Sequence, residues 1–512
     1  CGTVIEPMLM EQWFINMQKL AAPAIKALQA KKITFYPENK REQVITYLKN
    51  VRDWNISRQI AWGIPIPAFQ NVDDSDDWIF NTNVDREVIE VDGKTYRRDP
   101  DVFDTWFSSG HWPLVTLGYP DSDDFKRYYP NSVMETGQDI LYQWVARMIC
   151  IGLYVTGEIP FEKVYLHGMV RSEDGRKMSK SLGNVINPKE ILEANGADAL
   201  RMGMLSGRSA GYSAAFAPSK ITAGRNFCNK LWNIARYCET MLGDAVSHDK
   251  ARPESIADHW ILAQAQTTTT EVSQLIEDYR FSEAYERIYH FIWDDFADWY
   301  IEASKVGTNK QLLAELLETA LKLAHPFAPF VTETIWQTLN WTGETLLMSS
   351  NWPTPPGYDA KKAKEFEEIQ KIVSEIRYVT KALDVHGVSL YFKKNEFLNT
   401  NAPLLKKLAG LQQCKEVEAG RGMHLTSTKL DCWLDIDLAT AQKYVTKLKV
   451  TKLEKEAAIE RLEQRLANKG YTDKAPATVV QQTKDQLAEE QRLLAKVTQE
   501  LASFSSASDM IS

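Results

Sequence analysis

The sequence predicts a multidomain protein with an α/β part, an all-α bundle, a small mixed domain and an antiparallel coiled-coil hairpin. The 512 residues suffice for about three to four domains. The hydrophobic pattern changes along the chain from short β-rich runs to long amphipathic helices, and apolar residues near the C-terminus recur at heptad spacing. We expect domains at 1–218, 219–356, 357–438 and 439–505, with a tail at 506–512.

The composition fits an ordinary globular protein. Hydrophobic residues at 44% and charged residues at 25% exclude collagen-like, disordered and membrane classes. There is no run of eighteen apolar residues and no signal-peptide pattern, so we expect a cytoplasmic protein without a membrane span. The 6 cysteines form no C-x-x-C pair, and none lies at metal-ligand spacing with a histidine. We therefore expect no structural zinc and no disulfide framework.

The first 218 residues alternate between helical and β-rich patterns. Helical periodicity covers residues 11–29, and β-rich runs occupy 32–36, 88–91 and 163–166, separated by Gly, Pro and Asp turns. Strands that alternate with helices favour a parallel sheet.

Residues 219–350 are almost purely helical, with amphipathic stretches such as 261–275 and 311–324, which predicts a helical bundle. The proline-rich segment Asn351–Gly357 then interrupts the pattern. The following residues, to about 438, predict a small mixed domain with a helix at 366–383, whose role the sequence does not indicate.

The last segment predicts two long polar helices joined near residues 468–470, with Pro476 opening the second. Apolar residues lie at heptad spacing in the second helix, and related spacing occurs in the first: Val480, Leu487, Leu494 and Leu501, then Ile459, Leu462 and Leu466. This pattern predicts an antiparallel helical hairpin.

The charge of the hairpin is uneven. Residues 440–470 carry eight Lys and Arg against four Glu, a net charge of +4, which leaves −12 for the rest of a chain whose formal total is −8. A basic helix on an acidic protein suits contact with a phosphate backbone. The alternative interpretation is a solvated coiled-coil face.

One loop carries chemistry. Residues Gly175–Asn184 read G-R-K-M-S-K-S-L-G-N, after the strand that ends near Gly168 and before a helix that begins near Pro188. Two lysines, two serines and flanking glycines can bring ammonium and hydroxyl groups onto a polyphosphate. Such a loop can stabilise the charge that builds on pyrophosphate as an α-phosphate is attacked. The alternative is an exposed basic surface loop.

The string Lys177–Ser181 resembles the KMSKS signature of class I aminoacyl-tRNA synthetases, with its common Leu-Gly-Asn extension. Further segments resemble, in order, signatures of the valine, isoleucine and leucine subgroup: DWNISRQ at 53–59, DTWFSS at 104–109, GQDILYQW at 137–144, NFCNKLWN at 226–233 and HPFAPF at 325–330. The chain is most similar to the valyl-tRNA synthetases. This resemblance implies a Rossmann-like catalytic part and an anticodon-binding bundle, whose signatures we expect to be core because their apolar residues fall at helical spacing.

The resemblance implies that Trp106 and Trp144 wall the amino-acid pocket. Ile140 stands where isoleucine enzymes usually have Gln. Two indoles and an isoleucine make a dry, narrow slot that suits valine, although a core role is the alternative for each ring. The coiled-coil tail and the missing cysteine-rich zinc end also favour the valine type over the isoleucine type.

The ATP-binding residues that the resemblance implies are Lys177, Ser179, Lys180, Ser181, His167, Gly168 and Asp139. Lys177 and Lys180 would be catalytic and bind the phosphates, while the two serines shape the loop. Asp139 would take a ribose hydroxyl or the amino group of the adenylate, with a helix cap as its alternative. Backbone at His167 and Gly168 would approach the adenine, and a satisfied structural histidine is the alternative.

The implied partners are valine, ATP with Mg²⁺, and tRNA(Val), with no resident metal and a monomeric protein. The resemblance places tRNA contact on the hairpin, for which the candidate residues are Lys447, Lys452, Lys455, Arg461 and Arg465.

The chain also departs from the family. Ala61–Ile64 reads A-W-G-I where relatives usually have WWGH, and residues 70–101 lack the cysteine pairs that some members carry. No H-x-G-H motif, the other half of the class I ATP site, occurs anywhere, and Val4–Trp13 resembles the return from the inserted editing domain. We therefore expect the C-terminal part of a longer synthetase, weak or inactive alone. The alternatives are a non-catalytic synthetase-derived tRNA-binding protein and one chain of a split synthetase.

Overall fold

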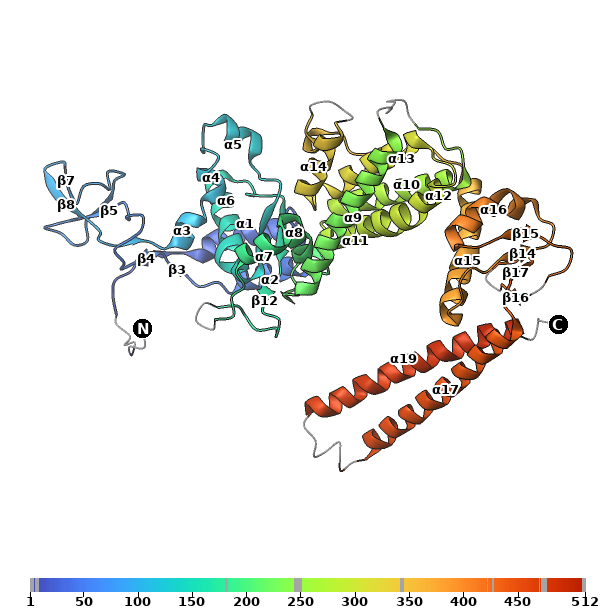
Figure 1. Ribbon diagram of the computed structural model, residues 1–512. Coiled ribbons are helices and arrows are strands. Elements are labelled where there is room, and N and C mark those ends of the chain that lie inside the picture. The colour runs from blue at the N-terminus through green and yellow to red at the C-terminus, as the bar shows by residue number, and fades with distance from the viewer. Residues whose placement is uncertain are drawn as a thin grey trace. The chain divides into compact units, whose positions relative to one another are not determined.

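The structure is a computed structural model (Figure 1) that describes residues 4, 9–179, 183–243, 251–340, 345–420, 422–425, 428–468, 470 and 477–508. The chain forms two compact units. The first comprises Cys1–Ala223 and Gln274–Ala284, and the second comprises Gly224–Ser273 and Tyr285–Ser512. No described helix combines the length and the apolar character that crossing a bilayer requires.

The first unit alternates strands and helices, as the sequence predicts. Its elements are β1 (Phe14–Ile15), α1 (Met17–Gln29), β2 (Thr34–Tyr36), α2 (Asn39–Lys49), β3 (Trp54–Asn55), β4 (Ser57–Arg58), β5 (Ala68–Asn71), β6 (Trp78–Phe80), β7 (Val88–Val91), β8 (Lys94–Arg98), β9 (Val102–Phe103), α3 (Thr105–Ser109), α4 (Trp112–Val115), α5 (Asp123–Tyr128), β10 (Met134–Gly137), the 3₁₀ turn η1 (Gln138–Ile140), the π-helical turn η2 (Leu141–Val145), α6 (Ala146–Thr156), β11 (Lys163–His167), β12 (Val170–Arg171), α7 (Pro188–Asn195), α8 (Ala197–Leu205) and β13 (Ala214–Ala215).

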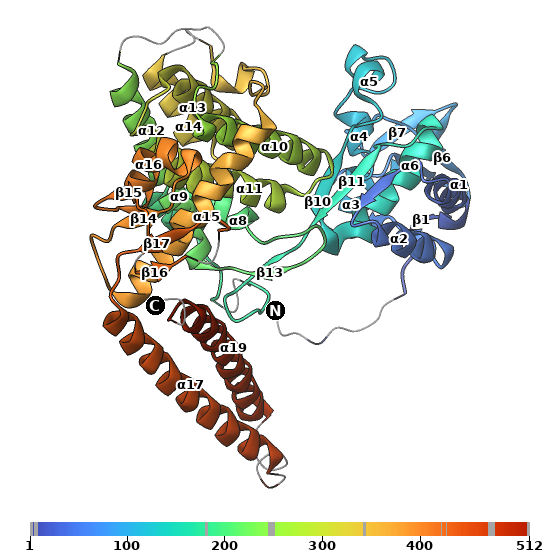
Figure 2. The ribbon, with the colours of Figure 1, turned by 90° about the vertical axis from the view of Figure 1, so that its right-hand side faces the viewer.

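A parallel sheet in the order β10-β11-β2 forms the centre of the first unit (Figure 2). Side chains alternate across a strand, so Phe35, Val164 and Leu166 enter a core that α1, α2 and α6 also line. The same alternation sends Tyr165 and His167 to the opposite face. The predicted parallel sheet is confirmed, and its second face is the one that bears the candidate site.

The helix predicted from residue 11 begins later. Asn16 has extended backbone, and its side-chain oxygen accepts a hydrogen bond from the amide of Lys19, so it caps α1 at Met17. Phe14 and Ile15 pair instead with β3 as β1. Phe14 and Ile15 lie at positions that fit the helical spacing of apolar residues, but they form a strand.

A second, antiparallel sheet in the order β6-β5-β8-β7 occupies the acidic segment that lacks cysteines. Its core consists of Phe69, Ile89 and Tyr96, with two partly buried neighbours. Asp77 joins its strands by accepting hydrogen bonds from Lys94 Nζ at 2.8 Å and Tyr96 Oη at 3.0 Å. No group of metal-ligating side chains occurs within the described ranges.

The helices α9 (Pro218–Leu242), α10 (Ile256–Glu277) and α11 (Phe281–His290) begin the helical part, and the second unit continues from them. Its further elements are the π-helical η4 (Phe291–Ile301), α12 (Glu302–Ser304), α13 (Lys310–Ala324), α14 (Pro329–Leu339), η5 (Leu347–Ser349), α15 (Ala360–Leu383), β14 (Leu390–Phe392), α16 (Glu396–Ala409), β15 (Cys414–Glu416), β16 (Met423–His424), β17 (Cys432–Leu434), α17 (Leu438–Ala467) and α19 (Ala477–Ser508). The predicted core role of the bundle signatures holds for Phe227 and Leu231, which are fully buried, but is wrong for Trp232 and Phe330, which are exposed.

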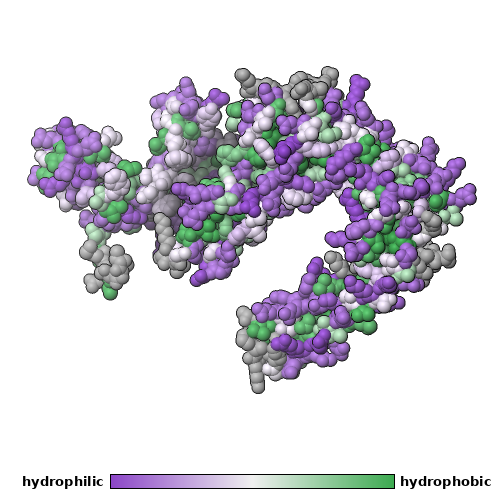
Figure 3. All heavy atoms as spheres, in the orientation of Figure 1, coloured by the Kyte–Doolittle hydropathy of each residue, from purple (hydrophilic) through white to green (hydrophobic). Residues whose placement is uncertain are grey.

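The small mixed domain holds a four-stranded sheet in the order β15-β14-β17-β16, and α15 and α16 pack beside it. The next helices, α17 and α19, run side by side in both views (Figures 1 and 2). Their predicted heptad residues are half-buried between them. The outer surface of this hairpin is largely hydrophilic on the face that Figure 3 shows.

Candidate functional site

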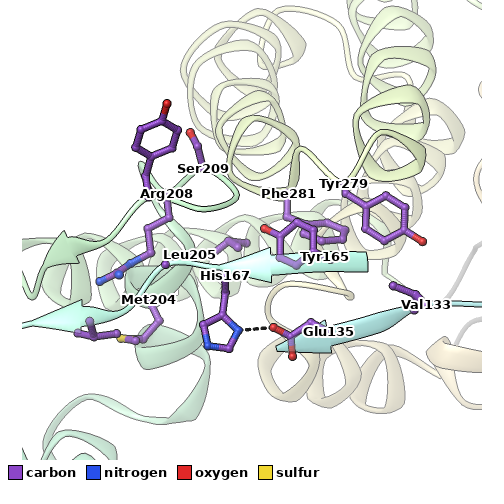
Figure 4. Close-up of a pocket in the computed structure, with 13 residues that line it drawn as sticks. Val133, Glu135, Tyr165, His167, Met204, Leu205, Arg208, Ser209, Tyr279 and Phe281 are labelled. Atoms are coloured by element: carbon purple, nitrogen blue, oxygen red, sulfur yellow. Dashed lines mark hydrogen bonds and ion pairs between the residues drawn. The ribbon is translucent and has the colours of Figure 1, made fainter. Parts of the chain in front are cut away.

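The second face of the parallel sheet borders a cavity of about 560 Å³ (Figure 4). We call it the sheet-face pocket. Its lining residues are Val133, Glu135, Tyr165, His167, Gly168, Val170, Met204, Leu205, Arg208, Ser209, Tyr212, Tyr279 and Phe281. It therefore contains two predicted ATP-site residues, His167 at the end of β11 and Gly168 directly after it.

His167 bonds one carboxylate of this pocket and lies near a second, that of Asp139, which is not part of the lining. Its Nδ1 is hydrogen-bonded to Oε1 of Glu135, as the dashed line in Figure 4 marks. A Cβ built on Gly137 would lie 2.7 Å from Oδ1 of Asp139 and 3.4 Å from Nε2 of His167, so glycine leaves room for both groups. The structure thus brings the predicted residues Asp139 and His167 together, and half-exposed His167 is no core histidine.

Asp139 does not cap a helix. Neither η1 nor η2 has a side-chain cap, and Asp139 is exposed and makes no hydrogen bond to any described residue. Its carboxylate is available to a ligand hydroxyl or amine. The helix-cap alternative is therefore wrong.

Glu135 is a site residue that sequence reasoning missed. It lies two positions before Gly137 on β10, opposite Tyr165 in register. Period-2 alternation along a strand would have placed its side chain on the same face as Gly137 and, across the sheet, as His167. The linear motif starts at Gly137, so this signal was available only through the strand assignment.

Gly168 is glycine because another segment crosses it. A Cβ there would lie 1.7 Å from the carbonyl oxygen of Tyr212. The amide of Gly211 donates to the Leu166 carbonyl at 2.7 Å, and the amide of Met169 donates to Ser213 Oγ at 3.0 Å. Close backbone packing, rather than a ligand, accounts for the missing side chain.

Arg208 adds a cation that the sequence motifs did not indicate. Its guanidinium lines the pocket, and burial lowers its pKa. Burial is the one cause of this shift, and no charged partner among the described residues offsets it. An uncompensated, partly buried cation favours an anionic ligand.

The KMSKS-like loop follows β12. Lys177 is exposed, and its ammonium contacts no described side chain. The amide of Ser179 donates to Oδ1 of Asn184 at 2.8 Å. The predicted residues Lys180 and Ser181 lie outside the described residues.

The predicted valine-pocket residues come from three neighbouring elements. Trp106 lies on α3, Ile140 ends η1, and Trp144 lies on η2. The indole nitrogen of Trp144 donates to the carbonyl of Ser109 at 3.0 Å, which ties η2 to the end of α3. Both tryptophans are partly buried against the core. Trp106 also lines a separate cavity of about 530 Å³, which neither Ile140 nor Trp144 borders.

Asp104 organises the surroundings of Trp106. It is buried, accepts a hydrogen bond from the amide of Trp106 at 3.3 Å, and so caps α3. Its other oxygen accepts from the indole of Trp54 at 2.9 Å and pairs with Arg58 at 3.1 Å. The guanidinium of Arg147 stacks on the Trp54 ring at 3.7 Å from its centroid. The sequence placed Asp104 in a motif but did not indicate this network.

The five predicted tRNA contacts on the hairpin are not equivalent. Lys447, Arg461 and Arg465 are exposed, and Lys452 is half-buried beside Glu456. Lys455 lies between the helices and pairs with Glu490 of α19 at 3.0 Å. Lys455 therefore belongs to the helix–helix contact rather than to the exposed basic surface.

Comparisons with known proteins agree with this geometry. The family described as tRNA synthetases class I (I, L, M and V) matches residues 3–215, the anticodon-binding domain of tRNA ligase matches 258–387, and the valyl tRNA synthetase tRNA binding arm matches 441–505. The fold also resembles methionyl-tRNA synthetase of Mycobacterium tuberculosis in complex with methionyl-adenylate, with a TM-score of 0.53 at 21% identity over 68% of this chain and 67% of that one. A LeuRS–tRNA–LeuAMS complex of Agrobacterium radiobacter K84 gives 0.51 at 20% identity over 70% and 47%. The chain belongs to the class I tRNA synthetases.

Relatives of known function indicate which family within this class the chain resembles. Valine--tRNA ligase of Geobacillus stearothermophilus is 38% identical over 94% of this chain and 57% of its own length, and that of Bacillus subtilis is 36% identical over 94% and 58%. With the matching arm, these relatives place the chain in the valyl-tRNA synthetase family. The chain spans little more than half the length of these relatives.

Proposed function

We propose that this chain supplies the KMSKS-type half of the ATP site, the valine pocket and the tRNA-binding parts of a valine--tRNA ligase. The observation that carries the proposal is its 38% identity to a valine--tRNA ligase over 94% of the chain. We assign the catalytic part to residues 1–218, the anticodon-binding bundle to 219–356, the connector to 357–438 and the tRNA arm to 439–505.

The reaction would begin with attack of the valine carboxylate on the α-phosphate of ATP. The new oxygen–phosphorus bond replaces the bond to the β-phosphate, and pyrophosphate leaves with the ATP-bound Mg²⁺. The valyl group then moves from the adenylate to the terminal ribose of tRNA(Val). Catalysis of such a step rests on positioning and on cations placed where charge develops.

The described residues fit distinct roles in that reaction. Lys177 extends from the loop toward solvent and would reach the phosphates, together with Lys180 and the hydroxyls of Ser179 and Ser181. Asp139, free of described partners beside His167, would take a ribose hydroxyl or the amino group of the adenylate. Backbone around His167 and Gly168 would meet the adenine.

The valine pocket would use Trp106, Ile140 and Trp144. Two indole faces and a branched aliphatic side chain disfavour a larger substrate by crowding it. The tRNA contacts would use Lys447, Lys452, Arg461 and Arg465, whose side chains lie toward the surface of the hairpin. Lys455 would support the arm by joining its helices. We expect the protein to act as a monomer.

Valine-dependent exchange of pyrophosphate into ATP tests the proposal. The 512 residues contain no H-x-G-H motif, so we expect very weak exchange from the chain alone. Adding a polypeptide that carries the other half of the ATP site, with its H-x-G-H motif (the HIGH half), should raise the exchange rate at least about 100-fold, the scale of restoring missing transition-state contacts. Isoleucine in place of valine serves as the specificity control, and a Lys177→Ala variant as the site control.

Three outcomes would contradict parts of this proposal. Strong exchange by the chain alone would show that the HIGH half is dispensable. A preference for isoleucine would overturn the valine assignment. Tight tRNA(Val) binding without exchange, even with the added half, would favour a non-catalytic tRNA-binding protein.

A further inference from the structure

The side chain of Asn184 gathers the main chain of the KMSKS-like loop. Its Oδ1 accepts a hydrogen bond from the amide of Ser179 at 2.8 Å, and its Nδ2 donates to the carbonyl of Lys177 at 3.2 Å. A backbone N–H can only donate and a backbone C=O can only accept. These two partners therefore define which end of the Asn184 side-chain amide carries the oxygen and which the nitrogen. Asn184 thus bonds both ends of the three-residue run from Lys177 to Ser179.

The third contact of Asn184 reaches the start of the loop. Nδ2 also lies 3.4 Å from Oγ of Ser172, a buried residue. Ser172 Oγ lies 2.6 Å from Oδ1 of Asp174, and the amide of Ser172 donates to the Arg176 carbonyl at 2.9 Å. Asn184 therefore links the turn at 172–176 to the segment that carries Lys177.

The residue before Asn184 has a left-handed backbone conformation. Gly183 has a φ of +63°, in the left-handed region that side chains disfavour. Glycine adopts this conformation without the strain that a side chain would bring.

We propose that Asn184 is a positioning residue of the nucleotide site, which holds the Lys177–Ser179 main chain in place before nucleotide binds. The inference rests on the proposed function, in which Lys177 contacts the phosphates. A segment already ordered loses less conformational entropy when its ligand arrives. Without the asparagine, ATP binding would have to order that segment.

Asn184→Ala removes all three contacts. Ser172→Ala leaves Asn184 and its two main-chain contacts in place, but removes the 3.4 Å contact together with the bonds of Ser172 Oγ to Asp174 and to the Arg176 carbonyl. The matched control is Asn187→Ala. Asn187 also accepts a backbone hydrogen bond, from Lys189 at 3.1 Å, but it caps α7, and its side chain bonds within residues 187–190. All variants are compared as the full chain, with thermal unfolding as the check on folding.

The first readout needs no nucleotide and no activity. Limited trypsin digestion, followed by mass spectrometry, measures cleavage after Arg176 and Lys177. We expect about a 10-fold faster cleavage in Asn184→Ala, about 2- to 3-fold in Ser172→Ala, and no change in Asn187→Ala, because each net hydrogen bond changes a local opening equilibrium by a few-fold to tenfold.

The second readout is the ATP dependence of pyrophosphate exchange with the HIGH-bearing half present. We expect Asn184→Ala to raise KM for ATP about 10-fold with little change in kcat, and Asn187→Ala to leave KM unchanged. A purely structural role would lower the amount of folded protein without moving KM.

The outcomes separate the two proposals. A wild-type complex without exchange overturns the proposed function and this inference with it. If the wild-type complex exchanges, an unchanged or lower KM for ATP in Asn184→Ala overturns the positioning role alone, whatever the cleavage rate. Unchanged trypsin cleavage in Asn184→Ala also overturns it, because the segment is then not held by this side chain.

Discussion

Two aspartates in different regions show opposite effects of their surroundings. Asp77, in the antiparallel sheet β6-β5-β8-β7, receives hydrogen bonds from Lys94, Asn71 and Tyr96, and these lower its pKa to about 2. Asp295, in η4 of the helical bundle, is desolvated, and burial raises its pKa to about 6. Its nearest cation, Arg287, lies 3.8 Å away and pairs more closely with Glu271 at 2.7 Å.

The difference reflects how much apolar core each region has. The antiparallel sheet buries three large side chains, so satisfied polar contacts between strands must help to hold it. The bundle buries long rows of leucines and aromatic residues and can retain a carboxylate that is unfavourably placed. The ionised carboxylate of Asp77 therefore stabilises the antiparallel sheet, whereas that of Asp295 destabilises the bundle.

Removing one buried ring from each region should give the largest effect. Phe296 in the bundle and Phe69 in the antiparallel sheet are both fully buried. Each change to alanine should cost about 3–5 kcal/mol. We expect Phe296→Ala to lower the unfolding temperature of the second unit, whereas Phe69→Ala should unfold residues 68–98 locally and leave the parallel sheet folded.

Hydrogen exchange by mass spectrometry distinguishes these results. Phe80→Ala, in the same antiparallel sheet but largely exposed, is the matched control and should change little. Retained protection of residues 68–98 in Phe69→Ala would show that this sheet has support beyond its three-residue core.

Asp295→Asn should give a smaller, pH-dependent gain. The folded pKa lies above the unfolded value of 3.8, so the folded state binds the proton more tightly. Stability therefore falls as pH rises from about 4 to about 6, and asparagine removes that loss. We expect a gain of about 2 kcal/mol at pH 7.5 that vanishes below about pH 4.

Thermal unfolding at several pH values measures this gain. Asp294→Asn is the comparison variant: Asp294 is half-exposed and pairs with His290. Its charge adds to the rise in the pKa of Asp295, so this change should lower that pKa only in part. An equal gain at pH 4 and pH 7.5 would mean that ionisation of Asp295 is not the cause.

The smallest expected effect is the loss of the stabilisation by Asp77 in acid. Its folded pKa of about 2 lies below the unfolded value of 3.8, so its contribution is present above about pH 4 and is lost as pH falls through about 2. We expect residues 68–98 of the wild type to lose exchange protection across that window, and Asp77→Asn to start from lower protection at pH 7 with a weaker acid dependence. A parallel acid response in both proteins would exclude Asp77 as the source.

Local sequence patterns predicted much of the fold. The runs at 88–91 and 163–166 are strands, and the stretches at 261–275 and 311–324 lie within α10 and α13. The start of α1 was predicted six residues too early, because the period of apolar residues cannot show that β1 pairs with β3 more than 35 residues away.

The candidate site divides in the same way. The KMSKS-like loop, Asp139, His167 and the tryptophans are visible as strings, because each motif is continuous in the chain. Glu135 and the Asp104 network are not, since their partners lie 32 to 50 positions away. The position of Lys455 between the two hairpin helices likewise depends on Glu490, 35 positions later.

The sequence by itself therefore determined the order of the elements, the loop that can meet a polyphosphate and the synthetase family that the motifs resemble. Only the tertiary structure decided that Asp139 and His167 meet at Gly137, that Tyr212 crosses Gly168 and that Asn184 holds Lys177 and Ser179. Periodicity and motifs record short-range constraints along the chain. Hydrogen bonds and close packing between distant segments depend on how the strands and helices are brought together, and that is settled by burial of the whole core.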